Sequence, residues 1–260
     1  MATTKTSLII HQFPCLSDNY GFLVHDASNQ LTACIDTPDV KTIEKALSDK
    51  QWNLTHILNT HHHWDHAGGN LELKEKTNCV IVGPRADADR IPGIDIQVGE
   101  GDIYQFGDFK ATIYDTPGHT RGHIVYHFAD ENCAFVGDTL FAMGCGRLFE
   151  GSPDQMWNSL QKIIRWPDDT RIYCAHEYTQ NNCRFAMTVE PGNQDLINRS
   201  IDIDKLRASN KFTVPTVLDI EKKTNPFLRP DSKNIQETIN MKGKPLVDVF
   251  ARIRELKDQF

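Results

Sequence analysis

Four of the chain's eleven histidines lie, with one aspartate, within a single stretch of six residues. Ring nitrogens and carboxylates at this density are costly to bury without a partner, but they are good ligands for a borderline metal ion such as zinc. His61 and His63 alternate along an extended segment, so both can face one ion while His62 points elsewhere. Asp65 and His66 follow in the next turn and can reach a second ion. The stretch therefore predicts a metal-binding loop that can serve two ions.

A strand and a helix are expected to position this loop. Residues 55–59 form a short apolar segment that is typical of a buried strand. Residues 67–76 begin with Ala-Gly-Gly and predict a tight turn that enters a helix. The loop is therefore expected at a strand end, where open sheets place ligands and chemistry.

Three further candidate ligands each follow a predicted strand. His119 comes after the strand at 111–114, and Asp138 comes after the strand at 133–136. His176 directly follows a predicted strand as well. Any one of these residues alone would more often be structural. Together they can complete three nitrogens for one metal ion and add a bridging carboxylate.

The distribution of predicted elements indicates two domains. Strand-like runs with polar turns occur in two groups before residue 176, and each group ends with a helix, which favours two packed sheets with helices outside. The predicted strands are 7–10, 20–24, 31–36, 55–59, 79–82, 111–114, 124–128, 133–136 and 171–175, and the helices are 39–47 and 153–166. After residue 177 helices are predicted at 181–189, 193–208, 217–223 and 245–256. We therefore predict domains at 1–176 and 177–260.

The composition of the chain narrows the classes of function that we expect for it. The chain has 260 residues, 39% hydrophobic residues and a net charge of −7, and it shows no apolar run of membrane-spanning length and no convincing signal peptide. We therefore expect a cytoplasmic globular protein that binds neither membranes nor nucleic acid. The seven cysteines include no Cys-x-x-Cys pair, and we expect reduced, buried thiols.

The order of these motifs resembles the metallo-β-lactamase superfamily, and their longer forms resemble its glyoxalase II family over essentially the whole chain. The matching segments are 60–70, 117–120, 137–141, 144–151, 176–179, 190–193, 225–227 and 257–260. The resemblance implies an αββα four-layer sandwich, the metallo-β-lactamase fold, followed by a C-terminal, mostly helical domain.

The resemblance also implies a ligand set for two divalent metal ions. The family uses zinc, with iron or manganese sometimes substituting. The first ion would be held by His61, His63 and His119, the second by Asp65, His66 and His176, and Asp138 would bridge both. Asp36 and His123 are candidates for supporting positions behind these ligands.

The activity implied is hydrolysis of S-(2-hydroxyacyl)glutathione thioesters. The main substrate would be S-D-lactoylglutathione, which gives glutathione and D-lactate and completes methylglyoxal detoxification. A hydroxide between the two metal ions would attack the thioester, and Asp65 would orient it, so no serine or cysteine nucleophile is needed. We expect a monomer.

Substrate contacts are implied at five positions, namely Arg147, Phe149, Tyr178, Arg254 and Lys257. Phe149 stands where the family has a tyrosine, so one hydrogen bond to glutathione is lost there. Arg254 and Lys257 are three residues apart and share one face of a predicted helix.

Other functions on the same scaffold are alternatives. A persulfide dioxygenase would use one iron with glutathione persulfide, but the helical C-terminal domain and the ending at 257–260 argue against it. A nucleic-acid phosphodiesterase disagrees with the net charge of −7. A non-catalytic binding module disagrees with the presence of all seven inferred ligands.

Overall fold

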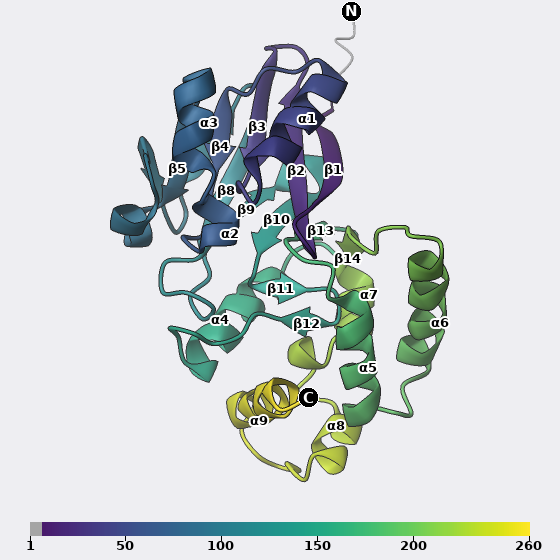
Figure 1. The fold of residues 1–260 in the computed structure, drawn as a ribbon. Helices are drawn as coiled ribbons and strands as arrows, with labels where there is room; N and C mark the ends of the chain where they lie inside the picture. Colours follow the sequence, from purple (N-terminus) through teal and green to yellow (C-terminus); the bar gives the residue numbers. More distant parts are fainter. Residues whose placement is uncertain (1–6) are drawn as a thin grey trace, which may run out of the picture. The chain divides into compact units, whose positions relative to one another are not determined.

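Two β-sheets form the framework of the first of two units (Figure 1). The computed structural model describes residues 7–260, and this unit holds the chain up to Asp115 together with Gly122–Gly137. One sheet has six strands in the order of the sequence: β1 (Ile9–Cys15), β2 (Asn19–Asp26), β3 (Leu31–Ile35), β4 (His56–Leu58), β5 (Val80–Pro84) and β6 (Ile96–Val98). Strands β1 to β3 pair antiparallel, whereas β3 to β6 pair parallel.

The second sheet of this unit is antiparallel. Its strands run in the order β10 (Cys133–Gly137), β9 (Ile124–Phe128), β8 (Phe109–Asp115) and β7 (Ile103–Phe106). The two sheets pack face to face, because the rings of Phe22 and Phe135 lie 5.5 Å apart. The buried Tyr126 hydroxyl also donates to the Asn59 carbonyl at 2.9 Å, which ties the second sheet to the end of β4.

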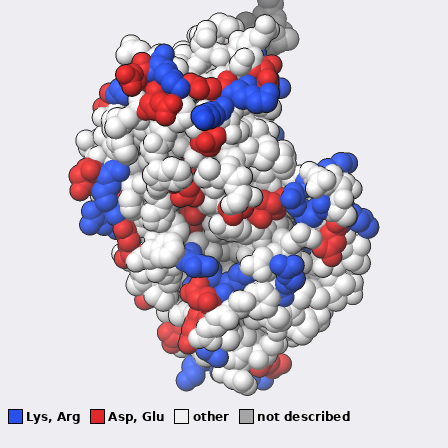
Figure 2. All heavy atoms as spheres, viewed as in Figure 1, with Lys and Arg blue, Asp and Glu red and all other residues white. Residues whose placement is uncertain are grey.

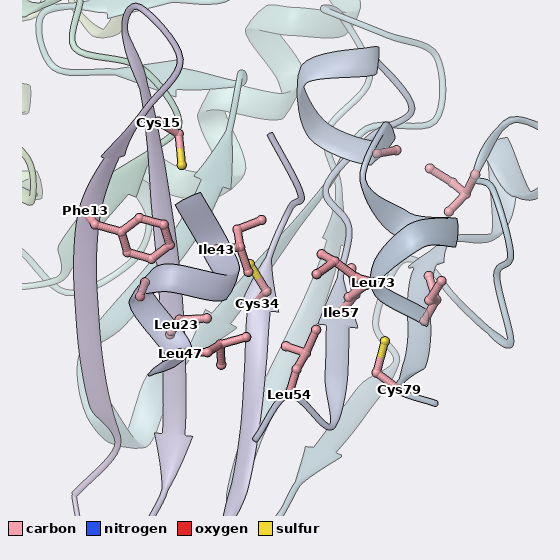
Figure 3. Packing of buried hydrophobic residues seen from close by; sticks show 14 residues of the cluster. Phe13, Cys15, Leu23, Cys34, Ile43, Leu47, Leu54, Ile57, Leu73 and Cys79 are labelled. Atoms are coloured by element: carbon pink, nitrogen blue, oxygen red, sulfur yellow. The ribbon is translucent and has the colours of Figure 1, made fainter. Parts of the chain in front are cut away.

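Helices α1 (Val40–Lys50) and α3 (Asn70–Thr77) cover the face of the first sheet that points away from the second (Figures 1 and 3). Ile43 and Leu47 of α1 and Leu73 of α3 pack against Leu23 and Ile57 of the sheet. The start of α1 is fixed because the Asp39 side chain accepts from the Thr42 backbone N–H at 2.8 Å. The other helical segments of this unit are α2 (Trp64–Ala67), η1 (Arg85–Arg90) and η2 (Ala129–Glu131).

The second unit is mostly helical and holds Thr116–Arg121 and Asp138–Phe260. Its helices are α4 (Pro153–Ile164), α5 (Thr179–Val189), α6 (Gln194–Ala208), α7 (Leu218–Thr224), η3 (Pro226–Leu228), α8 (Lys233–Thr238) and α9 (Leu246–Asp258). Its short strands form the pairs β11 (Leu140–Phe141) with β12 (Gly144–Cys145) and β13 (Arg171–Cys174) with β14 (Thr216–Val217). Helix α4 packs on α9 through Trp157 and Phe250, whose rings are 5.8 Å apart.

The regular elements predicted from the sequence are present, with ends shifted by a few residues. Several short elements were not predicted, namely β6, β7, β11, β12, β14, α2, α8 and the three η turns. The compact units divide the chain near 115, 121 and 137 rather than at 176, so the domain boundary stays a prediction.

All seven cysteines are buried and none forms a disulfide. Acidic and basic side chains are interspersed over the face shown in Figure 2. Within residues 7–260, no helix combines the length and apolar character that a membrane crossing requires.

Candidate metal centre

The histidine-rich loop leaves the carboxyl end of β4 and brings four donor side chains together in the first unit. His61 Nε2 lies 3.0 Å from His63 Nδ1, and His66 Nε2 lies 3.4 Å from Asp65 Oδ2. The rings of His61 and His66 are 4.0 Å apart, and both residues are buried. Because α2 begins at Trp64, Asp65 and His66 turn back toward the two preceding histidines. The loop therefore concentrates imidazole nitrogens and a carboxylate at one point.

Asp36 and Thr60 hold this cluster from behind. His66 Nδ1 donates to Asp36 Oδ2 at 2.9 Å. The same carboxylate accepts from the Thr60 backbone N–H at 2.7 Å and from its hydroxyl at 2.8 Å. His61 Nδ1 is 3.0 Å from Thr60 Oγ1, and the ring of His123 stacks on His61 at 4.8 Å. Since Nδ1 is engaged by the protein, Nε2 of His61 and His66 is the atom presented to a metal ion.

His62 faces a different set of partners from its neighbours. Its Nε2 accepts from Arg90 Nη1 at 3.1 Å, and its Nδ1 lies 3.3 Å from Asp87 Oδ2. Arg90 Nη2 also donates to the fully buried Asp87 carboxylate at 2.5 Å. A guanidinium can only donate, so His62 Nε2 is the acceptor and Nδ1, which faces Asp87, is the nitrogen that carries the ring proton. His62 therefore anchors the loop through Arg90 and Asp87 rather than joining the donors formed by its neighbours.

The second unit carries a cluster centred on Asp138. His119 Nε2 lies 3.3 Å from Asp138 Oδ2, and His176 Nε2 lies 3.4 Å from Asp138 Oδ1. All three residues are buried. His119 Nδ1 donates to the Arg147 carbonyl at 2.9 Å, which again directs Nε2 toward the carboxylate. Each oxygen of the Asp138 carboxylate thus lies near one histidine nitrogen, which is the arrangement expected of a carboxylate that bridges two metal ions.

The donors in both clusters fit divalent metal ions. They are imidazole nitrogens and carboxylate oxygens, with no cysteine sulfur, a set that suits zinc, iron and manganese. In His61, His66 and His119 the ring nitrogen that points away from the donors is held by a hydroxyl, a carboxylate and a carbonyl, respectively. That pattern of outer support is typical of metal-binding histidines.

Two of the predicted substrate contacts lie against the Asp138 cluster. The ring of Tyr178 stacks in parallel on that of His176 at 4.8 Å. The ring of Phe149 meets that of His119 edge-on at 5.2 Å and is 61% exposed. The two aromatic side chains therefore border the cluster with rings that retain access to solvent.

Arg254 and Lys257 of α9 have different surroundings. Arg254 is buried: its Nη1 donates to the Cys145 carbonyl at 2.8 Å, and its Nη2 donates to Asp258 at 2.8 Å. Lys257 is half-buried, with its Nζ over the rings of Phe185 and Phe260 at 5.4 and 5.0 Å. Direct contact of either residue with substrate stays a prediction.

Burial lowers the pKa of Lys257 to about 8. The positive charges of Arg254, Arg184 and Arg147 contribute a smaller part of this lowering, whereas Asp258 opposes it. This lysine therefore lies within a group of cations, which is a suitable environment for an anionic ligand.

Some supporting residues were not identified from the sequence. Asn19, Asp87 and Arg90 belong to segments that predict only a turn or a loop, and each reaches the histidine loop through the tertiary fold. Asp36 and His123, by contrast, were candidates for supporting positions, and they contact His66 and His61.

Comparison with known proteins defines the class of this fold and site. Residues 28–176 match the family model of the metallo-beta-lactamase superfamily, and residues 177–260 match the model described as hydroxyacylglutathione hydrolase C-terminus. The crystal structure of ETHE1 from Myxococcus xanthus is similar at a TM-score of 0.66 and 25% identity, covering 94% of this chain and 95% of that one. TTHA1623 in a di-iron-bound form is similar at a TM-score of 0.61 and 21% identity, covering 85% and 100%. The metallo-β-lactamase fold predicted from the sequence is thus confirmed.

Full-length relatives narrow the class further. A hydroxyacylglutathione hydrolase of Maricaulis maris is 51% identical over 98% of this chain and 100% of its own length. One of Brucella canis is 50% identical over the full length of both chains. The chain belongs to the hydroxyacylglutathione hydrolase family, as the sequence motifs predicted.

Proposed function

We propose that the chain hydrolyses S-(2-hydroxyacyl)glutathione thioesters, chiefly S-D-lactoylglutathione, to glutathione and the 2-hydroxy acid. The observation that carries the proposal is the set of histidine and carboxylate donors. His61, His66 and His119 are each held at Nδ1 by a hydrogen-bond partner. The loop itself brings His63 and Asp65 next to His61 and His66. Family membership and full-length relatives of the same name support the choice of substrate class.

The seven predicted ligands are proposed to bind two divalent metal ions. His61, His63 and His119 would bind one ion, Asp65, His66 and His176 would bind the other, and Asp138 would be shared. Zinc is the first choice, and iron or manganese satisfies the same donors. When bound, such ions supply the Lewis acidity that makes water acidic enough to act as a nucleophile near neutral pH.

The chain's own residues orient the reaction. Asp65 is proposed to hold the nucleophile in line with the thioester carbonyl and to take its proton on a carboxylate oxygen. Its neighbour His66 is kept in one tautomer by Asp36. The glutathione carboxylates are proposed to bind Arg147, Tyr178, Arg254 and Lys257, while Phe149 offers its ring alone.

A cysteine nucleophile is not needed and does not suit the structure. Cys145 is the thiol closest in sequence to the proposed glutathione contacts, but it is buried. Burial raises the pKa of Cys145 to about 11, so the reactive thiolate is scarce at neutral pH. The Cys145 carbonyl instead accepts a hydrogen bond from Arg254. The thioester is therefore proposed to be attacked by water rather than by this thiol.

The test is release of thiol from S-D-lactoylglutathione by protein of known metal content. The metal-replete wild type should turn over, and His61→Ala and Asp138→Ala should lose most of the rate. His11→Gln, which changes a histidine outside both clusters, should keep it. Failure of the metal-replete wild type to release thiol would reject the function. Oxygen uptake with glutathione persulfide and one iron per chain would favour the dioxygenase instead.

A cytoplasmic, monomeric state is part of the same proposal.

A further inference from the structure

Asn19 lies at the tip of the β1–β2 hairpin in the first unit. Strand β1 ends at Cys15 and β2 begins at Asn19, and these two residues form the last pair of the hairpin register. Residues Leu16–Asp18 connect the strands, so the position of the Asn19 backbone is set by strand pairing. The residue is only 6% exposed, although its side chain is a polar amide. Burial of an amide is costly unless the group is hydrogen-bonded.

The Asn19 amide makes its hydrogen bonds to Asp65. Nδ2 donates to Asp65 Oδ2 at 3.0 Å and approaches the Asp65 carbonyl at 3.5 Å. An amide nitrogen has two donors and no acceptor, and a hydrogen bond from it to an ionised carboxylate is charge-assisted. The oxygen that it contacts is the same Oδ2 that lies 3.4 Å from His66 Nε2. Asn19 therefore contacts the side of the Asp65 carboxylate that faces the next ligand.

We propose that Asn19 is a positioning residue for Asp65. Its amide fixes the rotation of the carboxylate, so Asp65 presents one orientation to the neighbouring donors. The inference rests on the proposed function, because the orientation of Asp65 matters through its roles as ligand and as holder of the nucleophile. Groups that hydrogen-bond to a metal ligand typically change metal affinity or activity about 10–100-fold when they are removed.

A purely structural contact between the hairpin and the loop is the competing explanation. Removing such a contact would lower the free energy of unfolding but would leave ion retention and turnover of the folded protein unchanged. A positioning role predicts the opposite pattern, in which ion retention and kcat fall and KM is almost unchanged. The two explanations are therefore separated by measuring the free energy of unfolding, the retention of the ion and the kinetic constants on the same samples.

The experiment compares Asn19→Ala, Asn19→Asp and Ser17→Ala with wild type. Asn19→Ala removes the donor, and Asn19→Asp replaces it at nearly equal size with a charge that repels Asp65. Ser17 lies in the same turn, is exposed and donates to Asp18 at 3.1 Å, so Ser17→Ala is the matched control. Each zinc-loaded protein is assayed for thioester hydrolysis, for the rate at which a chelator removes zinc, and for its free energy of unfolding.

Both Asn19 variants should show kcat lowered about 10–100-fold, and Asn19→Ala should also lose zinc faster, while Ser17→Ala matches wild type. The proposal would be overturned if Asn19→Ala has the same kcat and the same rate of zinc loss as wild type. It would also be overturned if only the free energy of unfolding changes. If the wild type itself fails to hydrolyse the thioester, the proposed function fails, and the chelator assay still decides whether Asn19 supports the metal ligand.

Discussion

Asp36 accepts a hydrogen bond from His66 Nδ1 at 2.9 Å while its own backbone adopts a left-handed conformation with φ of 58°. The residue follows β3, and its carboxylate also accepts two hydrogen bonds from Thr60 at the end of the neighbouring strand β4. One carboxylate thus fixes the tautomer of a candidate ligand and the start of the histidine loop. Asparagine and aspartate tolerate left-handed backbone better than most residues, so Asp36→Asn can preserve the local fold.

Asp36→Asn should weaken metal retention and activity about 10–100-fold, because the charge that stabilises His66 Nδ1–H is removed. The measurement is zinc release to a chelator together with thioester hydrolysis. Asp39→Asn is the matched control, since Asp39 caps α1 by accepting from Thr42 and asparagine caps helices equally well. Equal zinc retention in Asp36→Asn and wild type would show that Asp36 supports only the backbone.

The candidate metal ligands stood out in the sequence because the histidine loop and each of the three later positions come after a predicted strand. A ligand at a strand end carries a local signal, as in the apolar run that precedes Asn59 and the histidines. The partners that hold those ligands carry no such signal. Asn19 and Arg90 reach the loop only because β1–β2 and η1 fold beside it, and sequence spacing does not show that approach.

The short elements escaped prediction for a related reason. Strands such as β11 and β12 are two residues long, which is too short for an alternating pattern. The pair is instead held by tertiary contacts, since the Asn225 amide donates to the carbonyls of Phe141 and Gly144 at 3.1 and 3.0 Å. Strands β11 and β12 therefore depend on the position of η3, whose residues are distant from them in the sequence.

Phe149→Tyr should lower KM for the glutathione thioester about twofold to twelvefold and leave kcat nearly unchanged. The ring is 61% exposed, so a hydroxyl can be added without steric conflict. A new hydrogen bond contributes about 0.5–1.5 kcal/mol, which corresponds to that range in KM. The edge contact with His119 should be retained, whereas Phe149→Leu should lose it without lowering KM. An unchanged KM in Phe149→Tyr would show that this position does not contact glutathione.

Asp87→Asn should destabilise the protein by about 1–3 kcal/mol, because it removes the charged partner of the half-buried Arg90. Asp87 is fully buried between His62 and Arg90. The measurement is the free energy of unfolding in urea. Lys45→Met breaks the Lys45–Asp49 pair, whose side chains are 73% and 57% exposed, and should cost less than about 1 kcal/mol. Similar small losses in both variants would contradict an anchoring role for Asp87.

The protonation of Lys257 should make the capture of substrate depend on pH. Its pKa is lowered to about 8, so it is protonated below that pH and loses its positive charge as the pH rises through this value. Because the substrate is anionic, kcat/KM should fall between about pH 7 and about pH 9.5, and this profile reports the pKa values of the free enzyme. Burial and the nearby Arg254, Arg184 and Arg147 are the causes of the shift.

Lys257→Arg separates this titration from all others in the protein and the substrate. Arginine stays charged throughout the range, so the fall in kcat/KM above about pH 8 should be smaller than in wild type. Lys257→Met lacks the charge at every pH and should have a low kcat/KM at neutral pH, with a flatter profile. The comparison of the three profiles is the measurement. If wild type and Lys257→Arg decline in parallel, the charge on Lys257 does not contribute to capture of the substrate, and the fall belongs to another group.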